Sequence, residues 1–376
     1  MKIVIACGGT GGHLFPGVAV AERLLARDHE VRLLVSAKAV EQTALTGLVA
    51  TSCCSRLGVR SIRGVGFGGL SRLIPFCGQL ARAVRECAAE YATFSPDVVL
   101  GMGGYTSAPA VLATRWFGRR TRAVIHESNA VPGKANRWTG RWADHVAVGL
   151  ADCARFFRRT PVTVTGTPLR ARLGRGERVA DAAARLGLTP GRLTVAVMGG
   201  SQGAHALNEA IACALPWLEE WRERAQFVHL SGAADEAFVR EAYERNGMAA
   251  RVLGFCHEME WVYSAADVVV ARAGAATLTE LAAFGLPAIL VPYPHAAGNH
   301  QWHNAQAWAR VGAARVLEER ALTTGLHAAR GERLAEAVDQ LLGDAAARTE
   351  MARAARSLAR PDAAEKLANL IEQCGP

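Results

Sequence analysis

Short runs of apolar residues, rich in valine and isoleucine, alternate along the chain with longer stretches in which alanine and leucine recur among arginines. The runs have the length of β-strands, and continuous apolar strands separated by helices are typical of parallel sheets covered on both faces. The first series of predicted strands comprises Lys2–Cys7, Glu30–Ser36, Asp97–Gly101, Ala123–His126, His145–Val148 and Val162–Thr165. The second comprises Leu193–Met198, Gln226–Leu230, Arg251–Gly254, Asp267–Ala271, Ala288–Pro292 and Ala314–Leu317.

Two such series predict two doubly wound, Rossmann-like α/β domains rather than one barrel. We place the first domain at residues 1–165 and the second at 166–349, with the boundary at Gly166-Thr-Pro-Leu-Arg170 and the arginine-rich stretch after it. A terminal helix is predicted over Arg348–Cys374. Periodicity leaves open whether the stretch from about residue 350 to 376 packs on the second domain or returns to the first.

Composition and charge narrow the class of protein. Half of the 376 residues are apolar and 20% are charged, which excludes a disordered or fibrous chain. Residues 1–165 hold 21 basic and 10 acidic residues, whereas residues 166–376 hold 22 and 24, so the net charge of +9 comes from the first part alone. This asymmetry predicts an anionic partner for that part: nucleic acid, acidic lipid or a phosphorylated substrate.

The cysteines and the hydropathy of the chain indicate which cellular compartment the protein occupies. The nine cysteines are an odd number without a Cys-x-x-Cys pair, which favours reduced thiols over disulfides or a zinc ribbon. The N-terminal apolar run is too short for a signal peptide. The longest uncharged stretches, Val98–Thr114 and Leu281–Ala309, are interrupted by glycine and proline, so neither predicts a spanning helix. We expect a soluble or peripheral protein.

Glycine-rich turns follow four of the predicted strands, where open α/β sheets bind ligands. Glycine lets backbone N–H groups approach an anion, and a following helix N-terminus adds a favourable dipole. Two turns in each half favour a ligand cleft between the domains. The turns are Gly8–His13, Gly101–Ser107, Gly199–Ala204 and Arg272–Thr277.

Common nucleotide motifs do not fit these turns. The first glycine turn is followed by Leu14 where a dinucleotide fold needs its last glycine. The second predicted strand ends near Ser36, where that fold needs an Asp or Glu to hold the ribose. No Gly-Lys-Ser/Thr follows any turn, and the chain contains no Asp-x-Asp. A nicotinamide dehydrogenase, a P-loop enzyme and a metal-clamped nucleotide-sugar site are therefore disfavoured.

Polar residues near the turns are candidates for binding and catalysis. Glu280 lies about two turns into the helix after Arg272–Thr277. Its carboxylate could accept hydrogen bonds from the two hydroxyls of a ribose, or it could simply complement the helix dipole, and the sequence favours neither interpretation. The amides and imidazoles of Asn299–Asn304 could bind the hydroxyls of a sugar, or the segment could be a polar loop that leads into a helix. A metal site at His300 and His303 is disfavoured. His13 lies where a helix N-terminus keeps imidazole neutral and able to act as a base. His126-Glu-Ser-Asn129 follows another strand end.

Taken together, the motifs resemble those of the MurG family of bacterial N-acetylglucosaminyltransferases, in the same order over nearly the whole chain. The motifs are GGTGGHLFP (8–16), VLGMGGYTSAP (99–109), HESN (126–129), GGSQGA (199–204), RAGAATLTE (272–280) and NHQWHN (299–304). The resemblance implies a B-type glycosyltransferase fold and an inverting transfer of GlcNAc from UDP-GlcNAc to the MurNAc 4-hydroxyl of lipid I, releasing UDP in peptidoglycan synthesis. It implies no cofactor and no required metal.

Site residues carried over from the resemblance fall into two groups. The donor would meet Thr10, Gly11, Gly12, Asn129, Arg170, Ser201, Cys256 (through its backbone), Ala275, Ala276, Thr277, Glu280, Gln301 and Asn304. The acceptor diphosphate would meet Gly12, His13, Gly103, Gly104 and Tyr105. His13 is the favoured base, with Glu127 as its competitor. Ser128 and Ala273 depart from residues common in the family, but they replace neither Asn129 nor Glu280.

An arginine-rich segment bears on the membrane. Six arginines and no acid lie between Glu41 and Glu86, and an apolar stripe at helical spacing runs from Leu70 to Val84. Such a stripe is ordinarily the core side of a helix, but the arginines favour docking on anionic lipid. The family places its membrane patch here, which implies Leu70, Arg72, Leu73, Ile74, Phe76 and Arg82 and a peripheral position on the cytoplasmic face of the plasma membrane.

Other functions are also compatible with the sequence. Within enzymes they are another B-type glycosyltransferase with a lipid acceptor, such as a diacylglycerol glucosyltransferase, and a UDP-GlcNAc epimerase. A nucleic-acid-binding module is disfavoured because the arginine run contains only Phe67 and Phe76 as stacking aromatics.

Overall fold

The computed structural model describes residues 1–8, 11–36, 55–63, 73–116, 120–170, 173, 176, 178–200, 203–323 and 331–376. The chain divides into two compact units, Met1–Ala171 with Arg360–Pro376, and Arg172–Ala359. We call them the first and the second unit. The segment Gly166–Arg170, which the sequence placed at the start of the second domain, belongs to the first unit.

The first unit is built on a parallel sheet with the strand order β3-β2-β1-β4-β5-β6-β7. The alternation of side chains along a strand sends Ile3 and Ile5 into one core and Val4 and Ala6 into the other, so both faces are covered. The strands are β1 Lys2–Ala6, β2 Glu30–Val35, β3 Leu57–Ser61, β4 Val98–Gly101, β5 Arg122–Glu127, β6 His145–Val148 and β7 Val162–Val164.

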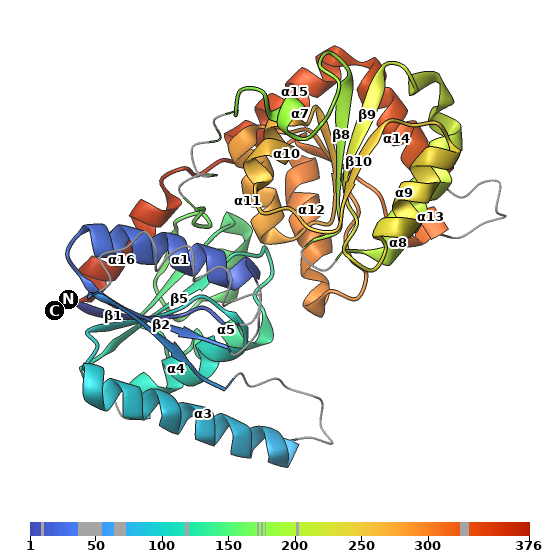
Figure 1. Ribbon diagram of the computed structural model, residues 1–376. Helices are drawn as coiled ribbons and strands as arrows, with labels where there is room; N and C mark the ends of the chain where they lie inside the picture. Colours follow the sequence, from blue (N-terminus) through green and yellow to red (C-terminus); the bar gives the residue numbers. More distant parts are fainter. Residues whose placement is uncertain are drawn as a thin grey trace. The chain divides into compact units, whose positions relative to one another are not determined.

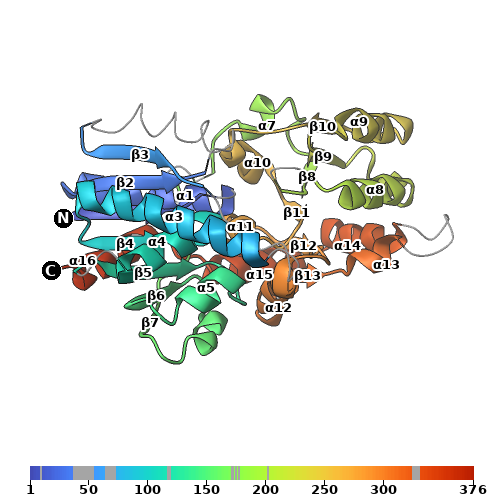
Figure 2. The ribbon, with the colours of Figure 1, turned by 90° about the horizontal axis from the view of Figure 1, so that it is seen from below.

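Helices pack on both faces of this sheet (Figures 1 and 2). Residues of α1 (Gly11–Ala26) and α16 (Ala363–Cys374) share one core with the sheet, and those of α3 (Leu73–Phe94) and α4 (Gly104–Trp116) share the other. The short helices α5 (Lys134–Thr139) and η2 (Ala151–Phe156) lie near the β5–β7 edge.

The C-terminal segment is where the predicted helix was wrong. Instead of one helix over Arg348–Cys374, the chain forms α15 (Ala345–Ser357) and α16, and Pro361 lies in the break because proline cannot continue a helix. α16 packs beside α1 in the first unit (Figure 1). There Arg27 donates to Glu372 at 2.6 Å and to Asn369 at 2.7 Å and also pairs with Glu365.

The second unit contains a parallel sheet with the strand order β10-β9-β8-β11-β12-β13. Val195 and Val197 of β8 face a core shared with α8 and α14, and Ala196 and Met198 face a core shared with α11 and α12. Its strands are β8 Leu193–Met198, β9 Ala225–Leu230, β10 Ala250–Leu253, β11 Val268–Ala271, β12 Ala288–Leu290 and β13 Ala314–Val316. Its helices are α7 Ala182–Arg185, α8 His205–Ala214, η3 Leu215–Trp221, α9 Glu236–Arg245, α10 Met259–Ala265, α11 Ala275–Phe284, η4 Ala297–Asn299, α12 His300–Arg310, α13 Glu319–Thr323, α14 Glu332–Gly343 and α15.

The two parallel sheets confirm the predicted α/β class, and each predicted strand is present to within two residues at either end. Strand β3 was not predicted, because Leu57-Gly-Val-Arg-Ser61 has neither an apolar run nor a regular alternation. In the described ranges, no helix is both long and apolar enough to cross a membrane.

The place of α16 gives a first prediction. Leu367 of α16 is fully buried in the core of the first unit, so Leu367→Ala should lower the stability of that unit by about 2–5 kcal/mol. Hydrogen exchange should show faster opening of β1 and β4 with β8 and β11 unchanged. The matched variant Leu341→Ala, in the core of the second unit, should give the opposite pattern. Equal opening of both sheets in either variant would contradict the assignment.

Candidate functional site

The four glycine turns lie at the two places where strand order reverses. In the first unit β1 lies between β2 and β4, and in the second β8 lies between β9 and β11. Loops leaving neighbouring strands diverge at such a point, which leaves the carboxyl ends of the strands accessible to a ligand. The turns after β1 and β4 and the turns after β8 and β11 therefore form one candidate site in each unit.

In the first unit, His13 and the turn after β4 lie against each other. A Cβ on Gly103 would lie 2.9 Å from Cδ2 of His13, and one on Gly104 would lie 3.2 Å from Nδ1 and 2.6 Å from the carbonyl oxygen of Gly8. Both glycines have positive φ, +93° and +76°. Only glycine fits this turn, and the turn holds the imidazole of His13 at the end of β1.

Glu127, the last residue of β5, is buried and accepts four hydrogen bonds. The donors are the backbone N–H and the Nδ2 of Asn129, at 3.0 and 2.9 Å, the N–H of Gly133 at 3.0 Å and Nδ2 of Asn136 at 3.0 Å. This carboxylate shapes the loop that carries Asn129 and joins it to α5. The structure therefore brings Glu127 and Asn129 of the motif together, and the Glu127 carboxylate accepts hydrogen bonds from the loop.

Asn136 was missed by the sequence reasoning. It is 3% exposed, and its Nδ2 also donates to the carbonyl of His126 at 3.0 Å, so one amide group holds the backbone of His126 and the carboxylate of Glu127. His126 donates from Nε2 to the carbonyl of Gly166 at 2.9 Å. Burial lowers the pKa of His126, so it stays neutral and serves to join β5 to the segment after β7.

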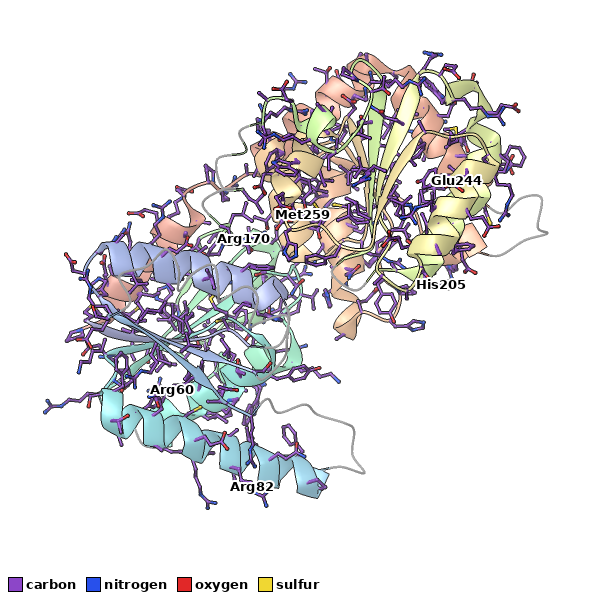
Figure 3. The ribbon with its side chains drawn as sticks, in the orientation of Figure 1. Arg60, Arg82, Arg170, His205, Glu244 and Met259 are labelled. Atoms are coloured by element: carbon purple, nitrogen blue, oxygen red, sulfur yellow. The ribbon has the colours of Figure 1, made fainter. Side chains whose placement is uncertain are left out.

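The remaining candidates of the first unit lie as follows. Gly11 and Gly12 begin α1, and Tyr105 is 48% exposed in the first turn of α4. The Arg170 guanidinium lies over the ring of Phe15 at 4.3 Å, beside α1 (Figure 3). Thr10 lies outside the described residues.

In the second unit, the turn after β11 leads into α11. Ala275, Ala276 and Thr277 form its first turn and are partly exposed, so backbone N–H groups of the helix N-terminus can meet an anion. Glu280 follows one turn later, and its Oε2 accepts a hydrogen bond from the hydroxyl of Tyr263 at 2.5 Å.

Buried polar side chains fix this turn from below. Asn304 is fully buried, and its Nδ2 donates to the carbonyl of Ala273 at 3.1 Å. Arg272 donates to the carbonyl of Val291 at 3.1 Å and pairs with Glu319. Asn304 thus contacts the turn itself. Gln301, one helical turn earlier, is partly exposed and accepts from the N–H of Tyr293 at 2.9 Å.

The turn after β8 packs tightly on the end of β9. Gly203 has φ +75°, and a Cβ there would lie 2.3 Å from the carbonyl oxygen of Ser231. Asn208 of α8 donates from Nδ2 to that same carbonyl at 2.9 Å and to Asp235 at 2.7 Å. Ser201 lies outside the described residues.

The amide of Asn208 also fixes the protonation of a buried histidine. Its Oδ1 faces Nε2 of His229 at 3.0 Å, so Nε2 carries the proton and Nδ1 accepts from the hydroxyl of Tyr243 at 3.1 Å. Burial lowers the pKa of His229 to about 3. Hydrogen bonds continue from Asn208 through Asp235 to His205, which lies at the exposed start of α8 (Figure 3). The hydrogen bond to Asp235 raises the pKa of His205.

The other candidate residues lie outside the glycine turns. Cys256 lies partly buried between β10 and α10, and burial raises the pKa of its thiol. Leu70 and Arg72 lie outside the described residues, and Leu73 and Ile74 begin α3 with only their backbone described, whereas Phe76 is partly exposed and Arg82 exposed. Within the described ranges, no three His, Cys, Asp or Glu side chains are grouped so that they could hold a metal ion.

Comparisons with known proteins show the family of this chain. Models of the glycosyltransferase family 28 N-terminal and C-terminal domains match residues 3–148 and 194–367. A UDP-N-acetylglucosamine–N-acetylmuramyl-(pentapeptide) pyrophosphoryl-undecaprenol N-acetylglucosamine transferase from Syntrophotalea carbinolica is 41% identical over 100% of this chain and 99% of its own. One of the same name from Geotalea uraniireducens is 40% identical over 97% and 96%. The chain belongs to the MurG family of glycosyltransferases.

Solved structures extend this likeness. The crystal structure of Acinetobacter baumannii MurG has a TM-score of 0.75 with 28% identity, and the match covers 99% of both chains. The kitacinnamycin glycotransferase has a TM-score of 0.69 with 19% identity over 100% and 99%, which shows a common fold alone. The B-type fold expected from the motifs is therefore confirmed for this MurG-family chain.

The buried histidine of the second unit gives a prediction on pH. The unfolded chain takes up a proton at His229 below about pH 6.5, whereas the folded unit does so only near pH 3, so stability falls as the pH drops below 6.5. Between pH 6.5 and 5 the loss should be about 2 kcal/mol. His229→Gln, which cannot titrate, should be less stable at pH 7 and lose less on acidification.

Hydrogen exchange of β8 and β9 in both proteins at matched pH measures this difference, because the intrinsic pH dependence of exchange cancels. Equal acid sensitivity of β9 in the two proteins would contradict the role given to His229.

Proposed function

We propose that this enzyme transfers GlcNAc from UDP-GlcNAc to the 4-hydroxyl of the MurNAc residue of lipid I, forming a β-1,4 linkage and releasing UDP in peptidoglycan synthesis. The observation that carries the proposal is the full-length identity of 41% to a transferase named for this donor and acceptor. The turns and polar residues of both units support it, because they supply sites for two phosphorylated substrates.

The donor is assigned to the second unit. Glu280 accepts hydrogen bonds from the ribose hydroxyls, and the N-terminus of α11 at Ala275–Thr277 binds on its phosphate side. The turn containing Ser201 holds the diphosphate, the backbone at Cys256 meets uracil, and the amide of Gln301 meets the sugar. Asn304 acts through the Ala273 carbonyl that it holds. The family resemblance also assigns Asn129, Arg170 and the turn Thr10–Gly12, which belong to the first unit, to the donor.

The acceptor is assigned to the first unit, where its diphosphate meets Gly12, Gly103, Gly104 and Tyr105. The MurNAc hydroxyl attacks the anomeric carbon of GlcNAc, its proton passes to a base, and the bond to UDP breaks with inversion. Charge developing on UDP is stabilised by backbone N–H groups, helix dipoles and Arg170. This mechanism requires no metal or cofactor.

His13 is the better candidate for the base. The carboxylate of Glu127 already accepts four hydrogen bonds at 2.9–3.0 Å, and a proton on it would turn one acceptor into a donor facing a donor. His13 is partly exposed beside the turn assigned to the acceptor. Glu127 then keeps Asn129 and α5 in place.

Kinetics of His13→Ala and Glu127→Gln test this assignment. His13→Ala should lower kcat by about 10²–10⁴-fold with UDP affinity unchanged, because a general base acts only in the transition state. If His13 is the base, kcat of the wild type falls at acidic pH. The residual activity of His13→Ala should lack this fall, and Glu127→Gln should keep it. Transfer of labelled GlcNAc to a lipid I analogue measures both. Loss of UDP binding in His13→Ala, or loss of the acidic limb in Glu127→Gln, would overturn it.

Membrane docking belongs to the first unit. The apolar stripe predicted on the helix divides in the structure: Val84 is buried in the core, whereas Cys77 and Ala81 are exposed. Arg82 and Arg85 are exposed beside them, and Arg82 projects from the outer side of α3 (Figure 3). A face that combines apolar and basic side chains suits an anionic lipid surface.

Exposed tryptophans support the same proposal. Trp116, Trp138 and Trp142 are 61%, 40% and 37% exposed, and the rings of Trp138 and Trp142 meet edge to face at 4.6 Å. Arg115, beside Trp116, donates to the carbonyl of Trp142 at 2.7 Å. Tryptophan favours the boundary between water and lipid, where its apolar ring and its N–H are both accommodated. The proposed position is peripheral, on the cytoplasmic face of the plasma membrane.

Charge reversal on α3 tests the docking. Arg82→Glu with Arg85→Glu should weaken binding to anionic liposomes by about 2 kcal/mol or more, roughly 30-fold, since each basic residue contributes about 1 kcal/mol near the surface. UDP affinity should be retained. The matched control is Arg251→Glu with Arg333→Glu, two exposed arginines of the second unit. Unchanged liposome binding at low salt, or an equal effect of the control pair, would contradict the proposal.

A further inference from the structure

Tyr263 is a buried tyrosine whose hydroxyl contacts the carboxylate of Glu280, the residue proposed to bind the ribose of the donor. It lies in α10, is 1% exposed and belongs to the core between the sheet and α11. Its ring packs against Phe284 with centroids 5.3 Å apart, and its hydroxyl donates to Oε2 of Glu280 at 2.5 Å. Phe284 and Glu280 are one turn apart on α11, so the ring and the hydroxyl contact the same face of that helix.

This contact has the properties of a positioning interaction. The hydroxyl donates to a carboxylate, and a hydrogen bond to a carboxylate is stronger than one between neutral groups. A glutamate side chain has several rotamers, and ordering them on binding reduces affinity. A rigid core residue that holds one carboxylate oxygen orients the whole group before a ligand arrives.

We propose that Tyr263 is a positioning residue that orients Glu280 for the ribose of the nucleotide donor and thereby sets the preference of the enzyme for a ribonucleotide over a deoxyribonucleotide. The inference rests on the proposed function, in which Glu280 binds the ribose diol. Tyr263 itself touches no substrate. Its effect reaches the ligand only through the carboxylate, so it depends on the presence of the ribose hydroxyls.

The second unit offers a matched control. Tyr243 is also buried, at 2% exposure, and its hydroxyl donates to Nδ1 of His229, away from α11. Tyr243→Phe therefore removes the same atom from a similar environment without touching Glu280. A loss caused merely by destabilising the unit should occur in both variants.

Calorimetric affinities for UDP, 2′-deoxy-UDP and 3′-deoxy-UDP provide the test, with wild type, Tyr263→Phe, Tyr243→Phe and Glu280→Gln. Wild type should prefer UDP. Tyr263→Phe should weaken UDP about 5- to 10-fold and the deoxy nucleotides much less, as expected for one charge-assisted hydrogen bond acting indirectly. Glu280→Gln should reduce the preference further, and Tyr243→Phe should keep it. In transfer assays Tyr263→Phe should raise the KM for UDP-GlcNAc with kcat little changed.

The outcomes separate the inference from the function beneath it. If Tyr263→Phe weakens all three nucleotides equally, or leaves UDP affinity unchanged, Tyr263 serves the fold alone and the inference is overturned while Glu280 keeps its role. If Glu280→Gln retains the full preference for UDP, the ribose contact is wrong and the inference falls with it. Absence of UDP binding by wild type would overturn the proposed function itself.

Discussion

Reversal of strand order beside the first strand of each sheet is the constraint on which both candidate sites depend. A parallel sheet covered on two faces must send its helices to opposite sides, so the loops after β1 and β4, and after β8 and β11, leave in diverging directions. The chain at that point must turn sharply and stay close to its neighbour. Gly103, Gly104 and Gly203 meet this requirement with positive φ and with no room for a Cβ.

Glycine makes such turns possible but leaves them flexible, and buried amides and carboxylates restore the order. Asn136 donates to the carbonyl of His126, Asn208 to that of Ser231 and Asn304 to that of Ala273, each from a fully or nearly fully buried side chain. In every case a helix side chain holds a backbone carbonyl at a strand end. The carbonyl of Ala273 belongs to the turn after β11, so that turn is ordered before a ligand arrives, which is the condition for strong electrostatic stabilisation.

Sequence reasoning succeeded where the information is local and failed where it is not. Apolar runs predicted strands such as β8 and β6 with their observed bounds, and the glycine motifs fall after strands that lie where the strand order reverses. Strand β3 has no local pattern, and the separation of α15 from α16 depends on Pro361 within an otherwise helical stretch. Asn208 and Tyr263 escaped notice because their partners, Ser231 and Glu280, lie 23 and 17 residues away. Only the fold makes them neighbours.

The charge asymmetry persists when the chain is divided as it folds. The first unit carries 24 basic and 13 acidic residues and the second 19 and 21, although the segment Arg360–Pro376 brings three acids to the first. Arginines such as Arg27, Arg32 and Arg122 are paired with acids of their own unit. In the part of the chain that the structure describes, the exposed arginines without an ion pair include Arg82, Arg85, Arg141, Arg158 and Arg159, on α3 and around the segment from α5 to β7. Pairs neutralise each other at a distance, so the outward field of the first unit comes from these unpaired residues. Under the proposed function, such a field suits a lipid-anchored diphosphate at an anionic surface, whereas the local dipoles of the second unit suit a soluble nucleotide donor.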